Sequence, residues 1–168
     1  MKLADVNAMS PAAFAAAFGR VFEHSPWIAE RAFATRPFAN RDALHSAMVD
    51  VVRGASHAEQ LALLRAHPEL AGREAQTNNL TAESTHEQQR AGLNALSKDD
   101  MTRITTLNAA HAEKFGFPFI IAARRNTKDQ ILAAFDARME SDVATELREC
   151  VAQVAIITRI RIDDLIDA

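Results

Sequence analysis

Apolar residues recur at helical spacing along most of the chain, and prolines, glycines and capping residues separate the segments. After Ser10-Pro11, an N-cap followed by proline in the first turn, phenylalanines recur every four residues at Phe14, Phe18 and Phe22. This pattern predicts a helix that ends near Ser25-Pro26. The same reasoning predicts the next three helices over residues 27–33, 40–53 and 57–67.

The second half of the chain has the same character. Residues 71–81 form a polar stretch that predicts a loop, and a helix carrying Ala91 and Leu96 is expected after it. The next helix is expected to begin at Ser97 and end at Gly116, with Asn108 and His111 on its apolar stripe.

A short apolar run over residues 117–123 is expected to form a buried connection that leads into a helix. Thr127 and Gln130 then form a capping box, and Ser141 is expected to cap the last helix. No repeat, low-complexity tract or linker divides the chain. The pattern therefore predicts one all-α domain over residues 1–168, a bundle of about eight helices.

The amino-acid composition excludes several classes of function. The 168 residues carry a net charge of −3 and one cysteine, Cys150, which excludes an internal disulfide and a cysteine-rich zinc site. With 19 basic and 22 acidic residues, the chain lacks the excess of positive charge that is typical of proteins that bind nucleic acid. No uninterrupted apolar run reaches the ~20 residues of a membrane span, and the first residues do not resemble a secretory signal, so we expect a cytoplasmic protein. Small-molecule or protein-partner chemistry remains.

Two polar stretches are candidates for a site. His67, before Pro68, lies at a predicted helix end, where the dipole favours an imidazolium that can donate a proton; a surface histidine is the other interpretation. Ser84-Thr85-His86-Glu87-Gln88 brings hydrogen-bonding groups to a predicted helix start, which can bind anions. Ser84 and Glu87 also match a capping box, which alone would explain both.

An apolar loop and an arginine complete the candidates. The loop at Phe119–Ala123 offers backbone groups beside aromatic walls, as a pocket floor for a planar heterocycle does, and as any buried connection does. Arg161 lies in the apolar stripe of the last helix and requires a partner, either a carboxylate such as Glu87 or an anionic ligand. Arg159, on a different face, is the competing arginine. The six histidines form no clear metal-binding set.

Taken together and in this order, these stretches resemble the 2-oxo-4-hydroxy-4-carboxy-5-ureidoimidazoline (OHCU) decarboxylase family. The blocks that carry the resemblance are His24-Ser25-Pro26-Trp27, Glu30-Arg31-Ala32, His67-Pro68-Glu69-Leu70-Ala71-Gly72, Ser84-x-x-Glu87-Gln88, Ala91-Gly92-Leu93, Lys114-Phe115-Gly116-Phe117-Pro118-Phe119-Ile120, and Arg161-Ile162 with Leu165. Each block is weak alone, but the ordered set is specific. Two positions depart from the family: Glu69 replaces a more usual aspartate, and Arg125 a frequent glycine.

The resemblance implies an all-α bundle, commonly a homodimer, that uses no metal and no organic cofactor. It implies decarboxylation of OHCU to (S)-allantoin in urate degradation, after urate oxidase and 5-hydroxyisourate hydrolase. His67 matches the catalytic histidine, and we expect Glu87 to act with it. The positions that match substrate-contacting segments are Pro68, Ser84, Thr85, His86, Glu87, Gln88, Phe119, Ile120, Ile121, Ala122, Ala123 and Arg161.

Two other functions compete with this interpretation. A non-enzymatic helical module that binds a small anion or a partner helix would show no release of carbon dioxide and no stereochemical preference. A metal-dependent hydrolase that uses His67, His86 and His111 would be sensitive to chelators.

Overall fold

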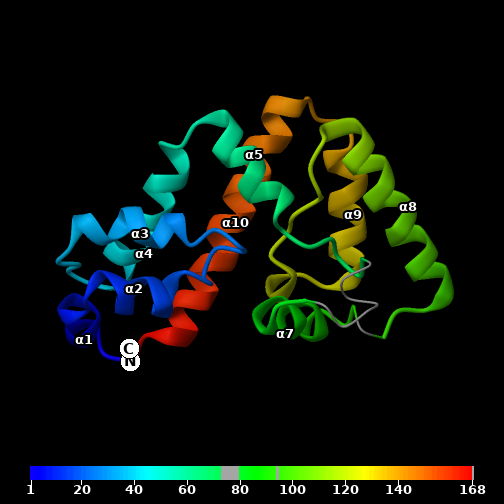
Figure 1. The fold of residues 1–168 in the computed structure, drawn as a ribbon. Coiled ribbons are helices and arrows are strands. Elements are labelled where there is room, and N and C mark those ends of the chain that lie inside the picture. The colour runs from blue at the N-terminus through cyan, green and yellow to red at the C-terminus, as the bar shows by residue number, and fades with distance from the viewer. Residues whose placement is uncertain (73–79, 94, 168) are drawn as a thin grey trace. The chain divides into compact units, whose positions relative to one another are not determined.

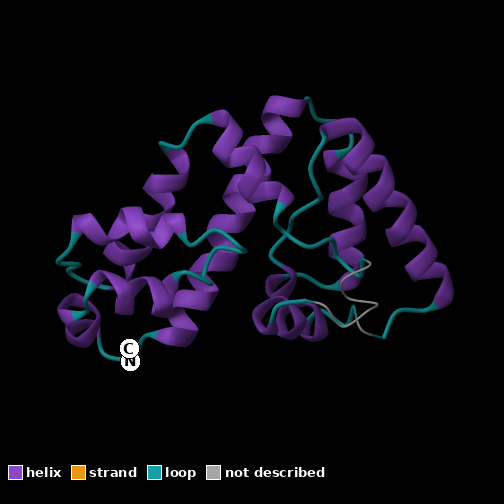
Figure 2. Cartoon of the chain, viewed as in Figure 1, coloured by secondary structure: helices purple, strands orange, loops and turns teal. Residues whose placement is uncertain are grey.

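The computed structural model describes residues 1–72, 80–93 and 95–167, and every regular element in them is a helix (Figures 1 and 2). The all-α prediction is confirmed. The elements are α1 (Leu3–Ala8), α2 (Pro11–Phe18), α3 (Trp27–Ala32), η1 (Phe33–Thr35), α4 (Arg41–Arg53), α5 (His57–Arg65), α7 (Ala82–Arg90), α8 (Lys98–Phe115), η2 (Ala123–Arg125), α9 (Lys128–Arg138) and α10 (Val143–Leu165). None of the helices described is both long and apolar enough to cross a membrane.

Two compact units make up the chain. The first comprises Met1–Ala66 and Ala155–Ala168, and the second comprises His67–Val154. Helix α10 contributes its beginning to the second unit and its end to the first. The single domain expected over residues 1–168 stays a prediction.

In the first unit, α2 begins as predicted but ends earlier. The Ser10 side chain accepts a hydrogen bond from the N–H of Ala13, and Phe14 and Phe18 are fully buried. The helix stops at Phe18 rather than near Ser25, because the chain turns back at Gly19, where a Cβ would lie 2.5 Å from the carbonyl oxygen of Ala15. Phe22 is buried from the turns that follow, so its four-residue spacing extended the predicted helix too far.

In the second unit, α8 has the predicted bounds. Ser97 caps its start, Asn108 and His111 are buried along it, and Gly116 ends it with a φ of 80°. The capping box of Thr127 is also confirmed. The cap of α10 is not the predicted Ser141: the Asp142 carboxylate accepts from the N–H of Thr145 at 2.7 Å, because α10 begins one residue later than expected.

An apolar core in the second unit joins segments that are far apart in the sequence. It includes Leu70, Ala71, Leu93, Ile104, Phe119, Ile121, Ala123, Ile131, Leu132 and Phe135. The rings of Phe119 and Phe135 stack with their centroids 3.6 Å apart. The core therefore brings together the residues after His67 and the loop that precedes α9.

Candidate active site

Helix α7 places three polar side chains on one buried face. The prediction of a helix start at Ser84 is wrong: α7 begins at Ala82, and the Thr81 side chain caps it by accepting from the N–H of Ser84. Ser84, Glu87 and Gln88 then share a face at positions i, i+3 and i+4, and each is less than 8% exposed. Since Thr81 is the cap, the capping-box interpretation of Ser84 and Glu87 is wrong too.

The other two residues of this stretch lie differently. Thr85 is half-buried, and its hydroxyl donates to the Thr81 carbonyl oxygen at 2.9 Å. His86 is exposed, away from the buried face. The structure thus groups Ser84, Glu87 and Gln88 and leaves His86 outside that group. The predicted helix carrying Ala91 and Leu96 in fact ends at Arg90.

The Gln88 amide fixes the segment that follows His67 and Pro68. Its Oε1 accepts from the N–H of Ala71 at 2.8 Å, and its Nε2 donates to the carbonyl oxygen of Glu69 at 3.3 Å. From α8, Asn108 Nδ2 donates to the carbonyl oxygen of Leu70 at 2.9 Å. These bonds hold Ala71 at a φ of 49°, a left-handed conformation that costs a non-glycine residue roughly 1–2 kcal/mol. His67 and Pro68, both half-buried, begin this fixed segment.

The predicted buried connection is confirmed as the third segment. Every residue of Phe119–Ala123 is buried, and η2, at its end, packs against α7. The peptide N–H of Ile120 is directed at the Cys150 thiol, whereas those of Phe119 and Ile121 have no backbone partner within the described residues. Buried peptide donors without a partner are rare in proteins. The loop therefore offers two peptide donors, at Phe119 and Ile121, in an apolar setting next to the helix that carries Glu87.

Arg161 belongs to the first unit, where it has a carboxylate partner. Its Nη1 lies 2.9 Å from Glu23 Oε2 and donates to the carbonyl oxygen of Val21 at 3.1 Å, and both charged side chains are buried. Glu23 was not predicted as a site residue because it lies just before the His24-Ser25-Pro26-Trp27 block and outside it. Arg159 contacts Asp163 and Asp42 at the surface.

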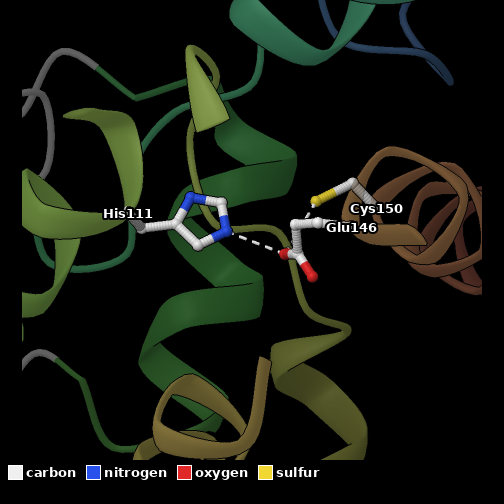
Figure 3. A group of neighbouring side chains, drawn as sticks. All are labelled: His111, Glu146 and Cys150. Atoms are coloured by element: carbon white, nitrogen blue, oxygen red, sulfur yellow. Dashed lines mark hydrogen bonds and ion pairs between the residues drawn. The ribbon is translucent and has the colours of Figure 1, made fainter. Parts of the chain in front are cut away.

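One close group of possible metal ligands exists among the described residues, and it is not the predicted histidine set. His111, Glu146 and Cys150 place one ligand atom each within 4.8 Å of one another (Figure 3). His67 and His86 are not part of that group. His111 comes from α8, and Glu146 and Cys150 lie one turn apart on α10.

The chemistry of this cluster does not fit a metal ion. The Arg138 guanidinium already contacts it, with Nη2 2.6 Å from Glu146 Oε1 and 3.1 Å from Cys150 Sγ. Burial raises the pKa of Cys150 to about 12, so the thiol in this network keeps its proton. Burial alone would raise the pKa of Glu146 as well, but hydrogen bonds from His111 and Arg138 outweigh it and the net pKa is lowered. The cluster is a hydrogen-bonded network built on the Arg138–Glu146 ion pair.

Comparison with known proteins explains why these segments occur together. Residues 7–163 match the family model described as OHCU decarboxylase. The chain belongs to the OHCU decarboxylase family. The resemblance derived from the ordered blocks is confirmed.

Relatives match along almost the whole chain. The 2-oxo-4-hydroxy-4-carboxy-5-ureidoimidazoline decarboxylase of Haloferax volcanii is 40% identical over 162 residues, which cover 96% of this chain and 94% of that protein. A uric acid degradation bifunctional protein of Bacillus subtilis is 37% identical over 162 residues, 96% of this chain but 32% of that protein. A solved (S)-allantoin synthase superposes with a TM-score of 0.78 at 28% identity, covering 99% of this chain and 55% of that one.

Replacement of Glu87 tests whether its role goes beyond helix stability. We expect Glu87→Gln to lower turnover about 10²-fold, because a buried carboxylate that orients a substrate group fixes its alignment, and a misplacement of about 1 Å costs that much. The matched control is Thr81→Ala, which removes the cap of α7 at a cost of about 1 kcal/mol and leaves Glu87 in place. The steady-state rate and the free energy of unfolding in urea are measured for both variants. If the two variants lose the same amount of rate for each kcal/mol of lost stability, the role of Glu87 is only structural.

Proposed function

We propose that this protein decarboxylates OHCU to (S)-allantoin in urate degradation, with stereospecific delivery of a proton. One observation carries the proposal: the second unit sets the buried polar face of α7 next to the buried loop that contains the peptide donors of Phe119 and Ile121, and ties this face to the His67 segment. Membership of the OHCU decarboxylase family gives this arrangement its substrate.

The substrate itself explains why such a site is sufficient. It carries a carboxylate and a hydroxyl on one ring carbon, next to a ring C=N that bears the ureido group. When the C–C bond to the carboxylate breaks, its electron pair moves toward the imine nitrogen and leaves an enol-like species. A proton added to the ureido-bearing carbon, with ketonisation of the hydroxyl, then yields allantoin. The substrate is its own electron sink, so the protein needs to supply alignment and one proton.

His67 is the proposed source or relay of that proton. Histidine is the side chain that most often serves as a general acid or base in catalysis. Its segment is fixed by Gln88 and Asn108, so the imidazole is attached to a held backbone. A proton delivered from one fixed side gives one enantiomer, whereas the spontaneous reaction gives both.

Glu87, Gln88 and the loop are proposed to align the ring. Glu87 and Gln88 hold the hydroxyl and ureido groups so that the breaking bond lies across the π system. The N–H groups of Phe119 and Ile121 bind oxygens of the ring. The buried apolar side chains of Phe119–Ala123 add a second effect, because charge leaves the carboxylate as neutral carbon dioxide forms. An apolar wall disfavours the charged ground state more than the transition state.

Several finer expectations stay predictions. These are the homodimer, the cytoplasmic location, the absence of a cofactor, and substrate contacts of Pro68, Ser84, Thr85, His86 and Arg161. Arg161 is expected to contact ring or ureido oxygens rather than the carboxylate, since a cation on the leaving group would stabilise the ground state. A binding module remains the competing function.

Circular dichroism of allantoin formation tests the proposal. Urate oxidase and 5-hydroxyisourate hydrolase generate the unstable substrate from urate, and the signal is followed with and without this protein, in the presence of EDTA. We expect a fast rise of the (S)-allantoin signal that EDTA does not change. No acceleration over the racemic background by a folded protein would reject the proposal in favour of the binding module. Loss of activity in EDTA would support the metal-dependent alternative.

A further inference from the structure

The side chain of Arg138, at the end of α9, contacts the candidate loop in two ways. Its Nη1 donates to the carbonyl oxygen of Ile120 at 2.7 Å, and its Cζ lies 4.2 Å from the centroid of the Phe119 ring. The same guanidinium donates through Nε and Nη2 to the Glu146 carboxylate, at 3.1 Å to Oε2 and 2.6 Å to Oε1. One planar group thus joins the loop to a buried carboxylate on α10.

His111 ties the beginning of the loop to the same carboxylate. Its Nδ1 lies 3.1 Å from the carbonyl oxygen of Phe117, which can only accept, so Nδ1 donates. Its Nε2 lies 2.7 Å from Glu146 Oε1, with one proton between the two atoms (Figure 3). The ring is fully buried and packs edge-on against Phe119 at 5.4 Å. Glu146 therefore orients two donors that each hold a different loop carbonyl.

Two amides fix the far end of the loop. Gln153 Oε1 accepts from the N–H of Ala122 at 3.0 Å, and Asn126 Nδ2 donates to the Ala122 carbonyl oxygen at 2.9 Å. The protein's own side chains thus hold the carbonyls of Phe117, Ile120 and Ala122. The peptide donors of Phe119 and Ile121 lie between these fixed points and have no backbone partner in the described part of the chain, while that of Ile120 faces the Cys150 thiol.

We propose that Arg138, oriented by Glu146 together with His111, is a positioning residue that sets the direction of the peptide donors in this loop for the substrate ring. This inference rests on the proposed function. The guanidinium can donate to the carboxylate and to Ile120 at once because its donors form a rigid planar fork, which a lysine ammonium does not reproduce. A misplacement of about 1 Å in an aligned substrate costs about 10²-fold in rate.

The test compares Arg138→Lys with Arg103→Lys. Arg103 makes an exposed 2.8 Å ion pair with Asp136 in the same unit, so the control is the same exchange away from the loop. We expect Arg138→Lys, which keeps a charge beside Glu146, to lower kcat by tenfold or more and to lower the enantiomeric excess of allantoin. Arg103→Lys should match the wild type in both. Hydrogen exchange at the amides of residues 119–121 should speed up in Arg138→Lys alone.

Three results would overturn the inference. The first is unchanged kcat and unchanged exchange in Arg138→Lys. The second is a rate loss equal to the fraction of unfolded protein, and the third is the same loss in Arg103→Lys. If Arg138→Lys does not fold, Gln153→Met removes the half-buried anchor of Ala122 and is judged by the same kcat and exchange criteria. If the wild type releases no carbon dioxide, the proposed function fails, and the exchange comparison alone decides whether Arg138 holds the loop.

Discussion

Replacing His67 by asparagine is expected to lower kcat by about 10²–10⁴-fold, the range by which a positioned general acid or base contributes to catalysis. Asparagine keeps a polar group of similar size next to Pro68 but cannot carry the proton. The residual product should be close to racemic, because the remaining pathway takes its proton from water. Stopped-flow decay of the enzymatically generated substrate gives kcat, and circular dichroism gives the enantiomeric excess.

The control for this experiment is His57→Asn. His57 is an exposed histidine at the start of α5, where the same exchange should change neither rate nor stereochemistry. Thermal unfolding of both variants should give the wild-type Tm, since neither residue is part of the apolar core. A His67→Asn enzyme with most of its activity, or with full stereospecificity, would remove His67 from the mechanism.

Replacing Glu146 by alanine is expected to have the largest effect on stability. The variant leaves Arg138 without its carboxylate and His111 without its partner at Nε2, both in a buried site. Breaking a buried ion pair from one side costs about 3–5 kcal/mol, against a total stability of about 5–15 kcal/mol for a typical protein. Urea unfolding at neutral pH measures the loss. The control is Glu113→Ala, an exposed glutamate on α8.

The stabilisation from Glu146 should also depend on pH in a defined direction. Its folded pKa lies below the ordinary value of 4.5, so between the two values the unfolded chain binds more protons than the folded one. The contribution is therefore complete above about pH 4.5 and is lost as pH falls through the folded pKa. The gap between wild type and Glu146→Ala should narrow in acid. A gap below about 1 kcal/mol at neutral pH would contradict a buried ion pair, since exposed pairs contribute that little.

The helices that the sequence predicts well are those with both a periodic apolar stripe and an unambiguous cap. Helix α8 has Ser97 before it and Gly116 after it, and no competing signal between them. Helix α7 was misplaced because Thr81 and Ser84 are both good caps, and Ser84 also has a glutamate three residues on. Local preference cannot separate the two. The burial of Ser84 against the rest of the unit determines that Thr81 is the cap, and burial is a tertiary effect.

In the candidate site, too, the features with a local sequence signal were predicted and those set by tertiary contacts were not. The segments that carry motifs could be identified because their order along the chain matches that of a known family. The residues that hold these segments in place could not be identified from the sequence. Arg138 lies in the last turn of α9 and Glu146 in the first turn of α10, where basic and acidic residues are favoured by the helix dipole. Their local setting fully accounts for them, so nothing in the sequence signals a long-range pair. Glu23, the partner of Arg161, is hidden in the same way.

Side chains from outside the loop hold the main chain of residues 117–123 at three carbonyls and one amide, in addition to the packing of its buried side chains, and this matters for altering the enzyme. Hydrogen bonds to main-chain groups do not depend on which side chain the residue carries. Ile120 and Ile121 can therefore be exchanged for other apolar residues of similar volume while the anchoring bonds at Ile120 and Ala122 persist. Libraries aimed at other cyclic ureides belong at these two positions, with Arg138, Glu146 and Gln153 kept constant.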